Sequence, residues 1–266
     1  MAQHEERSDI SIERKGAVAY LRIQRGSVNA VGPQTMRELS GALDAVRDDA
    51  GIRAVVIGHA GPHFIAGADF GFLQSLRDAT PQQIRDGIYE RFQQTLRQIY
   101  HFPKPTVAAI GGAAITVGCE LALACDFRLV TPRASFQESW IRLGLLPPLG
   151  GLKMLPALVG YGLAADMILR GRKVDGAEAA AKGLAHELVP AEELEARAWA
   201  LAGELAESAP LAYRAAKAGL RLALENSLED TFSAAVNEQA LLIQSEDFRE
   251  GVSAVTERRA PRFRGR

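Results

Sequence analysis

The residue with the clearest chemical potential is Glu120, an ionisable side chain inside a stretch of glycine and apolar residues. The apolar, β-branched run at 106–110 predicts a buried strand, a glycine-rich loop follows it, and an apolar helix starts near Gly118. The unpaired N–H groups of such a loop and helix start can hold an anion or a developing oxyanion. A carboxyl group beside these donors can move a proton at the carbon next to a carbonyl. The stretch therefore predicts chemistry next to a carbonyl group.

Glu120 also has a purely structural interpretation. A glutamate in the first turn of a helix stabilises the helix dipole without taking part in any reaction. The residues that flank it, Cys119 and Leu121, are apolar, however. Because a solvated glutamate usually has polar neighbours, we favour the proton-transfer role over the structural one.

The elements that must position this stretch alternate between strands and helices. In chain order we expect a hairpin at 10–13 and 17–23, a helix from Pro33, a strand at 54–57, a helix from Pro81 with Thr80 as its N-cap, strands at 106–110, 127–130 and 134–136, two helical segments at 150–159 and 161–170 separated by Gly160, a short helix at 177–182 and a strand at 187–189. This alternation is typical of an α/β fold. Residues 191–259 are helical almost throughout, so we divide the chain into an α/β core at 1–190 and a helical region at 191–266.

The composition argues against several classes of protein. Of the 266 residues, 47% are hydrophobic and 24% are charged, which suits a globular protein with a sizeable core. The formal net charge of −1 and the absence of a lysine-rich helix give no electrostatic argument for binding nucleic acid or an anionic membrane. The polar start of the chain predicts no targeting peptide, and no uncharged apolar run reaches ~18 residues. We therefore expect a cytoplasmic protein without a transmembrane helix.

Histidines and cysteines form no metal-binding pattern in the sequence. The five histidines are scattered, and neither cysteine accompanies any of them. Cys119 and Cys125 lie six positions apart in one apolar helix and fit reduced, buried thiols. We expect neither a metal nor a disulfide.

Four segments, in this order along the chain, resemble motifs of the enoyl-CoA hydratase/isomerase (crotonase) family. They are Arg25–Ala30 (family form R-P-x-x-x-N-A), Phe64–Asp69 (F-x-A-G-A-D), Lys104–Asp126 (K-P-x-x-A-A-x-x-G-x-A-x-G-G-G-x-E-L-A-x-x-C-D) and Glu250–Phe263, which is similar to the C-terminal helix and tail. The resemblance covers nearly the whole chain. It implies a crotonase-like spiral of ββα units, with C-terminal helices that make the contacts of a trimer or a dimer of trimers.

The same resemblance implies roles for particular residues. Two backbone N–H groups, those of Ala68 and Val117, correspond to the pair that holds the thioester carbonyl of an acyl-CoA. Glu120 corresponds to the first of two glutamates that hydratases of this family use as general acid and base. The sequence departs from the family at Thr116 and Val117, which replace two glycines. A β-branched residue still supplies its N–H, but its side chain narrows the approach and favours negative φ.

The second family glutamate is missing. Its position falls on Trp140, which cannot transfer a proton and which either forms a wall of the acyl site or packs in the core. We leave these two alternatives open. Glu138 lies two residues earlier and could point the same way along an extended segment, although the alignment does not place it there. Pro148 occupies the position of the aspartate that some isomerases and a dehalogenase branch carry, so dehalogenation is not supported.

The remaining expectations also follow from the resemblance. We expect substrate-binding positions at Ala66, Phe70, Gly118 and Trp140. Coenzyme A is part of the substrate, so no separate cofactor is expected. The basic tail at 262–264 resembles a segment that reaches the CoA phosphates of a neighbouring subunit, although most basic tails are only solvated.

Several reactions share the enolate that such a site would stabilise. We rank hydration of a 2-enoyl-CoA in fatty acid metabolism first, because Glu120 stands in the hydratase position. A double-bond isomerase comes second, since one carboxylate can move a proton within the substrate. Decarboxylation and C–C cleavage are further alternatives, as is a non-catalytic CoA-ester-binding oligomer. Loss of one acid/base group typically costs ~10²–10⁴ in rate.

Overall fold

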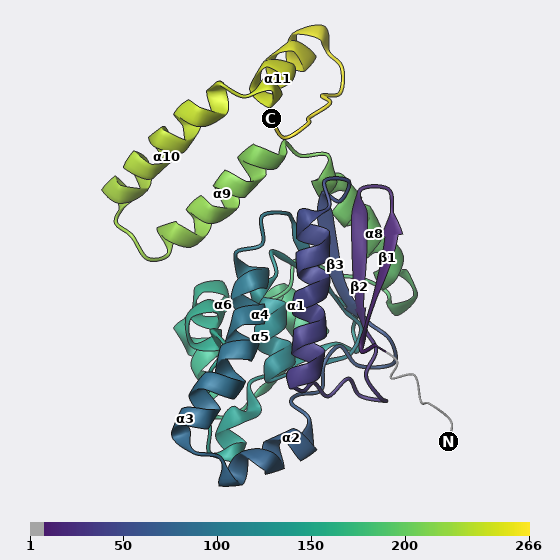
Figure 1. Cartoon of the computed structure of the whole chain (residues 1–266), viewed down its shortest axis with the longest axis vertical. Coiled ribbons are helices and arrows are strands. Elements are labelled where there is room, and N and C mark those ends of the chain that lie inside the picture. The colour runs from purple at the N-terminus through teal and green to yellow at the C-terminus, as the bar shows by residue number, and fades with distance from the viewer. Residues whose placement is uncertain (1–7) are drawn as a thin grey trace.

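The computed structural model describes residues 8–266 and shows an α/β core from which three C-terminal helices extend (Figure 1). Residues 1–7, on which the expectation of no targeting peptide rests, lie outside the described part of the chain. The strands are β1 (Ile10–Lys15), β2 (Val18–Ile23), β3 (Ala54–His59), β4 (Thr106–Ile110), β5 (Ala113–Ile115), β6 (Phe127–Val130), β7 (Ser135–Gln137), β8 (Lys173–Asp175) and β9 (Glu187–Leu188). The α-helices are α1 (Pro33–Asp48), α2 (Phe70–Ser75), α3 (Pro81–Gln83), α4 (Glu90–Tyr100), α5 (Val117–Ala124), α6 (Gly151–Leu169), α7 (Gly176–Ala181), α8 (Leu194–Ala206), α9 (Pro210–Ala223), α10 (Leu228–Ile243) and α11 (Glu246–Glu257).

Two sheets organise the core. The larger has the order β1-β2-β3-β4-β6-β9, in which only the β1–β2 hairpin is antiparallel. Every residue of β4 is buried, which explains why its sequence is an unbroken apolar run. The smaller sheet has the order β5-β7-β8. The sequence pattern predicts only a loop at 111–116, whereas Ala113–Ile115 pairs with Ser135–Gln137 as strand β5. A pairing between segments so far apart leaves no local signal.

Helices cover both faces of the large sheet. Buried side chains of α1, α4 and α5 pack in one apolar cluster with residues of β2 and β3. On the opposite face, α8 places the small residues Ala198, Ala202 and Ala206 against β2, β3 and β4. Figure 1 shows α1 and α8 on the two sides of the sheet. Helix α8 follows residue 190, at which we divide the chain, and packs on the core, while α9, α10 and α11 extend away from it.

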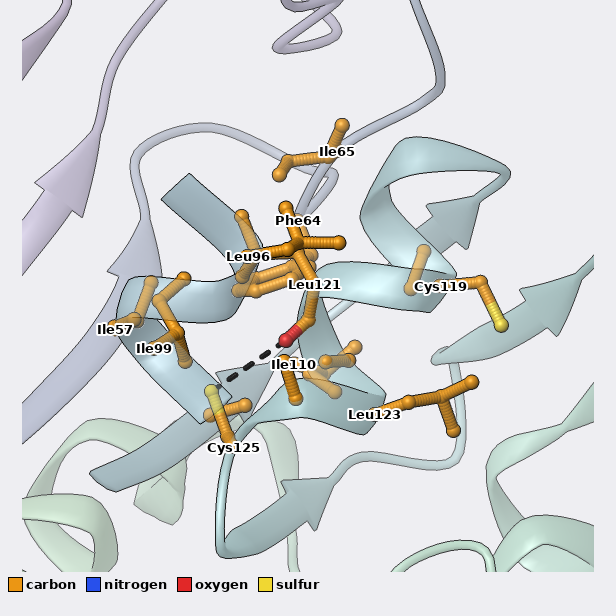
Figure 2. Close-up of a cluster of buried hydrophobic side chains, with 14 of the residues drawn as sticks. Ile57, Phe64, Ile65, Leu96, Ile99, Ile110, Cys119, Leu121, Leu123 and Cys125 are labelled. Carbon is orange, nitrogen blue, oxygen red and sulfur yellow. Dashed lines mark hydrogen bonds between the residues drawn. The ribbon is translucent and has the colours of Figure 1, made fainter. Parts of the chain in front are cut away.

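Helix α5 carries Glu120 and is enclosed on all sides, since all eight of its residues are buried. Figure 2 shows Leu121 among the side chains of other elements and the two cysteines at opposite ends of the helix. Both thiols are free and buried, as the sequence predicts.

The fully buried Arg128 binds the end of the helix, because its guanidinium donates to the carbonyls of Ala122 and Cys125. A cation at a helix C-terminus is favourably placed relative to the helix dipole.

Helix α6 is interrupted where the sequence predicts. Gly160 has a non-helical backbone (φ 76°, ψ 163°) and separates two shorter helical pieces. The helix as a whole is nevertheless long and apolar enough, by length and composition, to cross a membrane, and 28% of the relevant window is buried. The expectation of no such segment was therefore too strict. Each piece spans only about 15 Å, half the ~30 Å thickness of a hydrocarbon layer.

The C-terminal helices are held to the core by charge and hydrogen bonds. Asp126, at the end of α5, accepts from Lys217 (2.7 Å) and Arg221 (2.8 Å) of α9, and all three side chains are largely buried. The Arg221 guanidinium also lies over the ring of Tyr100, 3.7 Å from its centroid. Asp126 therefore has a structural role, since it joins the end of α5 to α9.

We predict that Gly118→Ala destabilises the protein. A Cβ atom at Gly118 would lie 2.5 Å from the carbonyl oxygen of Ile65, too close for either backbone to remain in place. Overpacking of this kind typically costs about 1–3 kcal/mol. Chemical denaturation of the purified variant measures the change in the free energy of unfolding.

The matched control is Gly41→Ala, in the exposed interior of α1, where nothing lies within 4 Å of the added Cβ. There the substitution should stabilise the protein by about 0.5–1 kcal/mol, because alanine has the higher helix propensity. If both variants had the same effect, the close contact of Gly118 with Ile65 would be contradicted.

Candidate active site

The loop that carries Ala68 is fixed from behind by Asn29. The side-chain amide of Asn29 donates to the carbonyls of Ala60 and His63, both at 2.9 Å. Its side-chain oxygen accepts from the backbone N–H of Arg25 at 2.7 Å. Asn29 has a positive φ of 53°, a conformation that asparagine adopts more readily than most residues. The early motif of the sequence thus positions the loop and contributes no reactive group.

Asp69 ends this loop and starts the next helix. Its carboxylate accepts from the N–H of Phe72 at 2.8 Å and forms an ion pair with Arg25 at 3.1 Å. These two partners hold the pKa of Asp69 below its usual range. Asp69 therefore has a structural role, as the cap of α2 and as an ion-pair partner of Arg25.

The second loop approaches the first through Thr116. This residue adopts φ 49° and ψ −107°, an unfavourable backbone conformation for a β-branched side chain. Thr116 replaces a glycine of the family motif, yet its backbone keeps a positive φ, which glycine adopts without strain. The hydroxyl of Thr116 lies 3.2 Å from where a Cβ of Gly67 would be, so the two loops are in direct contact.

Two backbone donors remain free where these loops meet. Val117 is the first residue of α5, and its N–H has no acceptor among residues 8–266. The N–H of Ala68 is likewise unpaired in the described part of the chain, although Gly67 and Asp69 on either side bond to Val31. Ala68 and Val117 both line one narrow pocket. The structure therefore places the two residues that carry the predicted donors in the lining of one pocket.

Glu120 is fully buried and held by three donors. One carboxylate oxygen accepts from the backbone N–H groups of Leu149 (2.8 Å) and Gly151 (2.9 Å). The other accepts from the indole N–H of Trp140 at 3.2 Å. Burial raises the pKa of Glu120 to about 7, and the three donors oppose the shift. A carboxyl with this pKa changes its protonation state near neutral pH, as a general acid or base must.

Trp140 belongs to the pocket wall and also binds Glu120. It lies in a 3₁₀ segment, Ser139–Leu143, and only 3% of its surface is exposed. Its ring contributes to the same pocket as Ala68 and Val117. The structure agrees with both interpretations left open, because Trp140 packs in the buried core cluster and also lines the pocket. It adds a hydrogen bond that the sequence pattern does not indicate.

The other predicted substrate-binding residues do not line this pocket. Phe70 is 69% exposed, and Phe72 from the same helix lines the pocket in its place. Ala66 donates its N–H to Val28 behind the loop, and Gly118 packs against Ile65. The pocket is almost wholly apolar, and its lining consists of Ala68, Phe72, Leu73, Leu76, Tyr89, Phe92, Val117, Trp140 and Leu149.

Tyr89 is a pocket residue that sequence reasoning missed. The sequence predicts one continuous helix from Pro81, and the capping box of Thr80 with Gln83 confirms its start. The structure places a π-helical segment at Ile84–Tyr89 between α3 and α4. The sequence did contain a signal for Tyr89, because this residue precedes Phe92 and Leu96 by three and seven positions and so shares their helical face. Such π segments are frequent at functional sites.

Glu138 is the second residue that the sequence only suggested. It lies just before the 3₁₀ segment of Trp140 and is fully buried. Its side chain points inward, towards the same region as Glu120. Burial and the negative charge of Glu120 both raise the pKa of Glu138. The site therefore holds two buried carboxyl groups, of which only Glu120 occupies a family position.

Comparisons with known proteins agree on one family. The family model for enoyl-CoA hydratase/isomerase matches residues 13–266. A crotonyl-CoA hydratase of Syntrophomonas wolfei is 32% identical over 96% of this chain and 97% of its own. A 2,3-dehydroadipyl-CoA hydratase of Escherichia coli is also 32% identical, over 97% of this chain and all of its own. The crystal structure of a putative enoyl-CoA hydratase from Streptomyces coelicolor superposes with a TM-score of 0.92 at 30% identity, covering 100% of this chain and 98% of that one. The fold is thus the crotonase fold, and the chain belongs to the enoyl-CoA hydratase/isomerase family.

Proposed function

We propose that this crotonase-type enzyme hydrates a 2-enoyl-CoA, with Glu120 as the residue that moves the proton. The observation that carries the proposal is that Ala68 and Val117, whose N–H groups are unpaired among the described residues, line one pocket with Trp140, and that the Trp140 indole N–H binds the buried Glu120 carboxylate. The thioester oxygen would accept from both donors as negative charge develops on it. The enolate so formed would take its proton from Glu120.

The water that adds to the double bond needs a base. At neutral pH part of the Glu120 population is ionised, since its pKa is about 7. The ionised carboxylate would accept a proton from water at the β-carbon and return it to the α-carbon. Its three hydrogen bonds fix its orientation, so one group would serve both steps.

Double-bond isomerisation is a second candidate, favoured by one specific observation. Trp140 stands where a second acidic group would be, and its indole is a donor that cannot accept a proton. A single carboxylate is sufficient to move a proton from one carbon of the substrate to another. The hydratase remains our first proposal.

The apolar lining of the pocket supports an apolar acyl group. Phe72 and Phe92 stack at 5.6 Å between ring centroids, and Trp140 faces the same space. We propose that the enzyme uses no cofactor apart from the CoA carried by its substrate, and that it works in the cytoplasm in fatty acid metabolism.

We also propose that the protein forms a trimer or a dimer of trimers. Helices α9, α10 and α11 expose large apolar side chains, among them Leu220 (74%), Val236 (68%) and Val255 (80%). Exposed apolar surface of this extent is typical of subunit contacts. The molar mass in solution, compared with 28.7 kDa for one chain, tests this assignment.

We predict that the protein adds water to at least one member of a panel of short, long and aromatic 2-enoyl-CoA esters, and that Glu120→Gln lowers this rate ~10²–10⁴-fold. Glutamine has the shape of glutamate but cannot exchange a proton at neutral pH. Loss of ultraviolet absorbance by the conjugated thioester gives the rate, and mass spectrometry shows whether water has been added.

The matched control is Glu192→Gln, an exposed glutamate remote from the pocket, which should leave the rate unchanged. A product of unchanged mass with a moved double bond would replace the hydratase by the isomerase. Full activity of Glu120→Gln would remove Glu120 from the mechanism.

A further prediction concerns pH. Because Glu120 must be ionised to accept a proton, kcat/KM should fall as the pH drops through about 7, the pKa of this group. Trp140→Phe keeps an aromatic wall but removes one donor to the carboxylate. A hydrogen bond to a charged group contributes about 1.5–3 kcal/mol, so this acid limb should move upward by about 1–2 pH units. An acid limb that stays in place in Trp140→Phe would show that the titrating group is not Glu120.

A further inference from the structure

The buried carboxyl group of Glu138 has no assigned role, and it is the most unusual polar group near the site. Its side chain is fully buried, directly after strand β7. Neither of its two oxygens lies in hydrogen-bonding geometry with any donor among residues 8–266. Nearly all buried polar groups in proteins have a partner, so an orphaned carboxyl calls for an explanation.

The groups around Glu138 carry no compensating positive charge. Helix α5 contributes the thiol of Cys119 and the carboxylate of Glu120, and the 3₁₀ segment contributes the Trp140 indole. The π segment contributes the phenol of Tyr89, whose pKa is raised by burial and by the Glu120 charge. No basic side chain in the described part of the chain forms an ion pair with Glu138 or Glu120.

The two carboxyl groups have very different surroundings. Glu120 accepts three N–H bonds of 2.8–3.2 Å, which favour its ionised form. Glu138 accepts no bond of comparable geometry, and the nearby Cys119 thiol and Trp140 indole only partly oppose the upward shift of its pKa. Two negative charges in one buried site repel each other strongly, so the pair keeps one proton. Burial and the neighbouring Glu120 charge both raise the pKa of Glu138 well above its usual range. The shared proton therefore resides on Glu138 when Glu120 is ionised.

We propose that Glu138 is a positioning residue: a neutral carboxylic acid that keeps the Glu120–Glu138 pair at a single negative charge and leaves the Trp140 indole N–H to Glu120. This proposal rests on the proposed function, since Glu138 acts only through Glu120. If Glu138 ionised, its charge would compete for the indole N–H and disfavour the Glu120 carboxylate. The site therefore works in the pH range where exactly one member of the pair holds a proton, with two macroscopic pKa values that belong to the pair.

Infrared spectroscopy of the substrate-free protein tests the protonation state without any reaction. At about pH 8 exposed carboxyl groups are ionised, so a carboxylic-acid C=O band that shifts in D₂O identifies a buried protonated acid. We expect this band in the wild type and in Glu120→Gln, and its loss in Glu138→Gln. Absence of the band from the wild type would overturn the proposal, even if Glu138→Gln failed to fold. Persistence of the band in folded Glu138→Gln would overturn it equally.

The pH dependence of activity supplies the second test. Glutamine at 138 imitates the neutral acid but cannot ionise, so the pH profile of Glu138→Gln should retain the acid limb. It should lose the alkaline limb that ionisation of Glu138 produces in the wild type. A purely structural role would leave the alkaline limb unchanged, and that result would contradict the proposal. Full activity of Glu120→Gln would reject the proposed function while leaving the infrared result in force, so the two failures can be told apart.

Discussion

The site depends on keeping one carboxylate, that of Glu120, inside an otherwise apolar helix. A buried carboxylate is costly unless hydrogen bonds replace the lost water. Here the replacements come from the start of α6 and from Trp140, so three separate segments must meet at one side chain. Their donors fix the direction of the carboxyl group, while burial keeps its pKa near neutrality. Two further contacts fix the position of α5, which carries Glu120: the cap by Arg128 and the close packing of Gly118 against Ile65.

Replacing the second acidic position by Trp140 changes the balance of the site. The indole ring adds apolar surface to the pocket, and its N–H adds a donor to Glu120. Trp140 therefore cannot transfer a proton, but its N–H orients the carboxylate of Glu120. Glu138, two residues earlier, restores a second carboxyl to the site, but from a buried position that does not line the pocket.

Much of this could be predicted from the sequence, because several signals were local. The apolar run at 106–110, the break at Gly160 and the cap at Thr80 each specify their own geometry, and the family motifs identified Ala68, Val117 and Glu120. The features that escaped prediction depend on contacts between distant segments or on backbone irregularity. The three donors to Glu120 come from residues 20–31 positions away, and strand β5 exists only through its pairing with β7. Phe70 was assigned to the substrate because it lies next to the motif, but the turn of α2 points it outward and Phe72 inward.

The most direct test of the account separates proton transfer from the addition of water. A saturated acyl-CoA cannot be hydrated, but a site with two oxyanion donors and an ionisable Glu120 should still exchange its α-hydrogens. We predict that the wild-type protein in D₂O incorporates deuterium at the α-carbon of bound butyryl-CoA, as followed by proton NMR, and that Glu120→Gln abolishes this exchange without abolishing binding. Exchange at an unchanged rate in Glu120→Gln would contradict the central role given to this carboxylate.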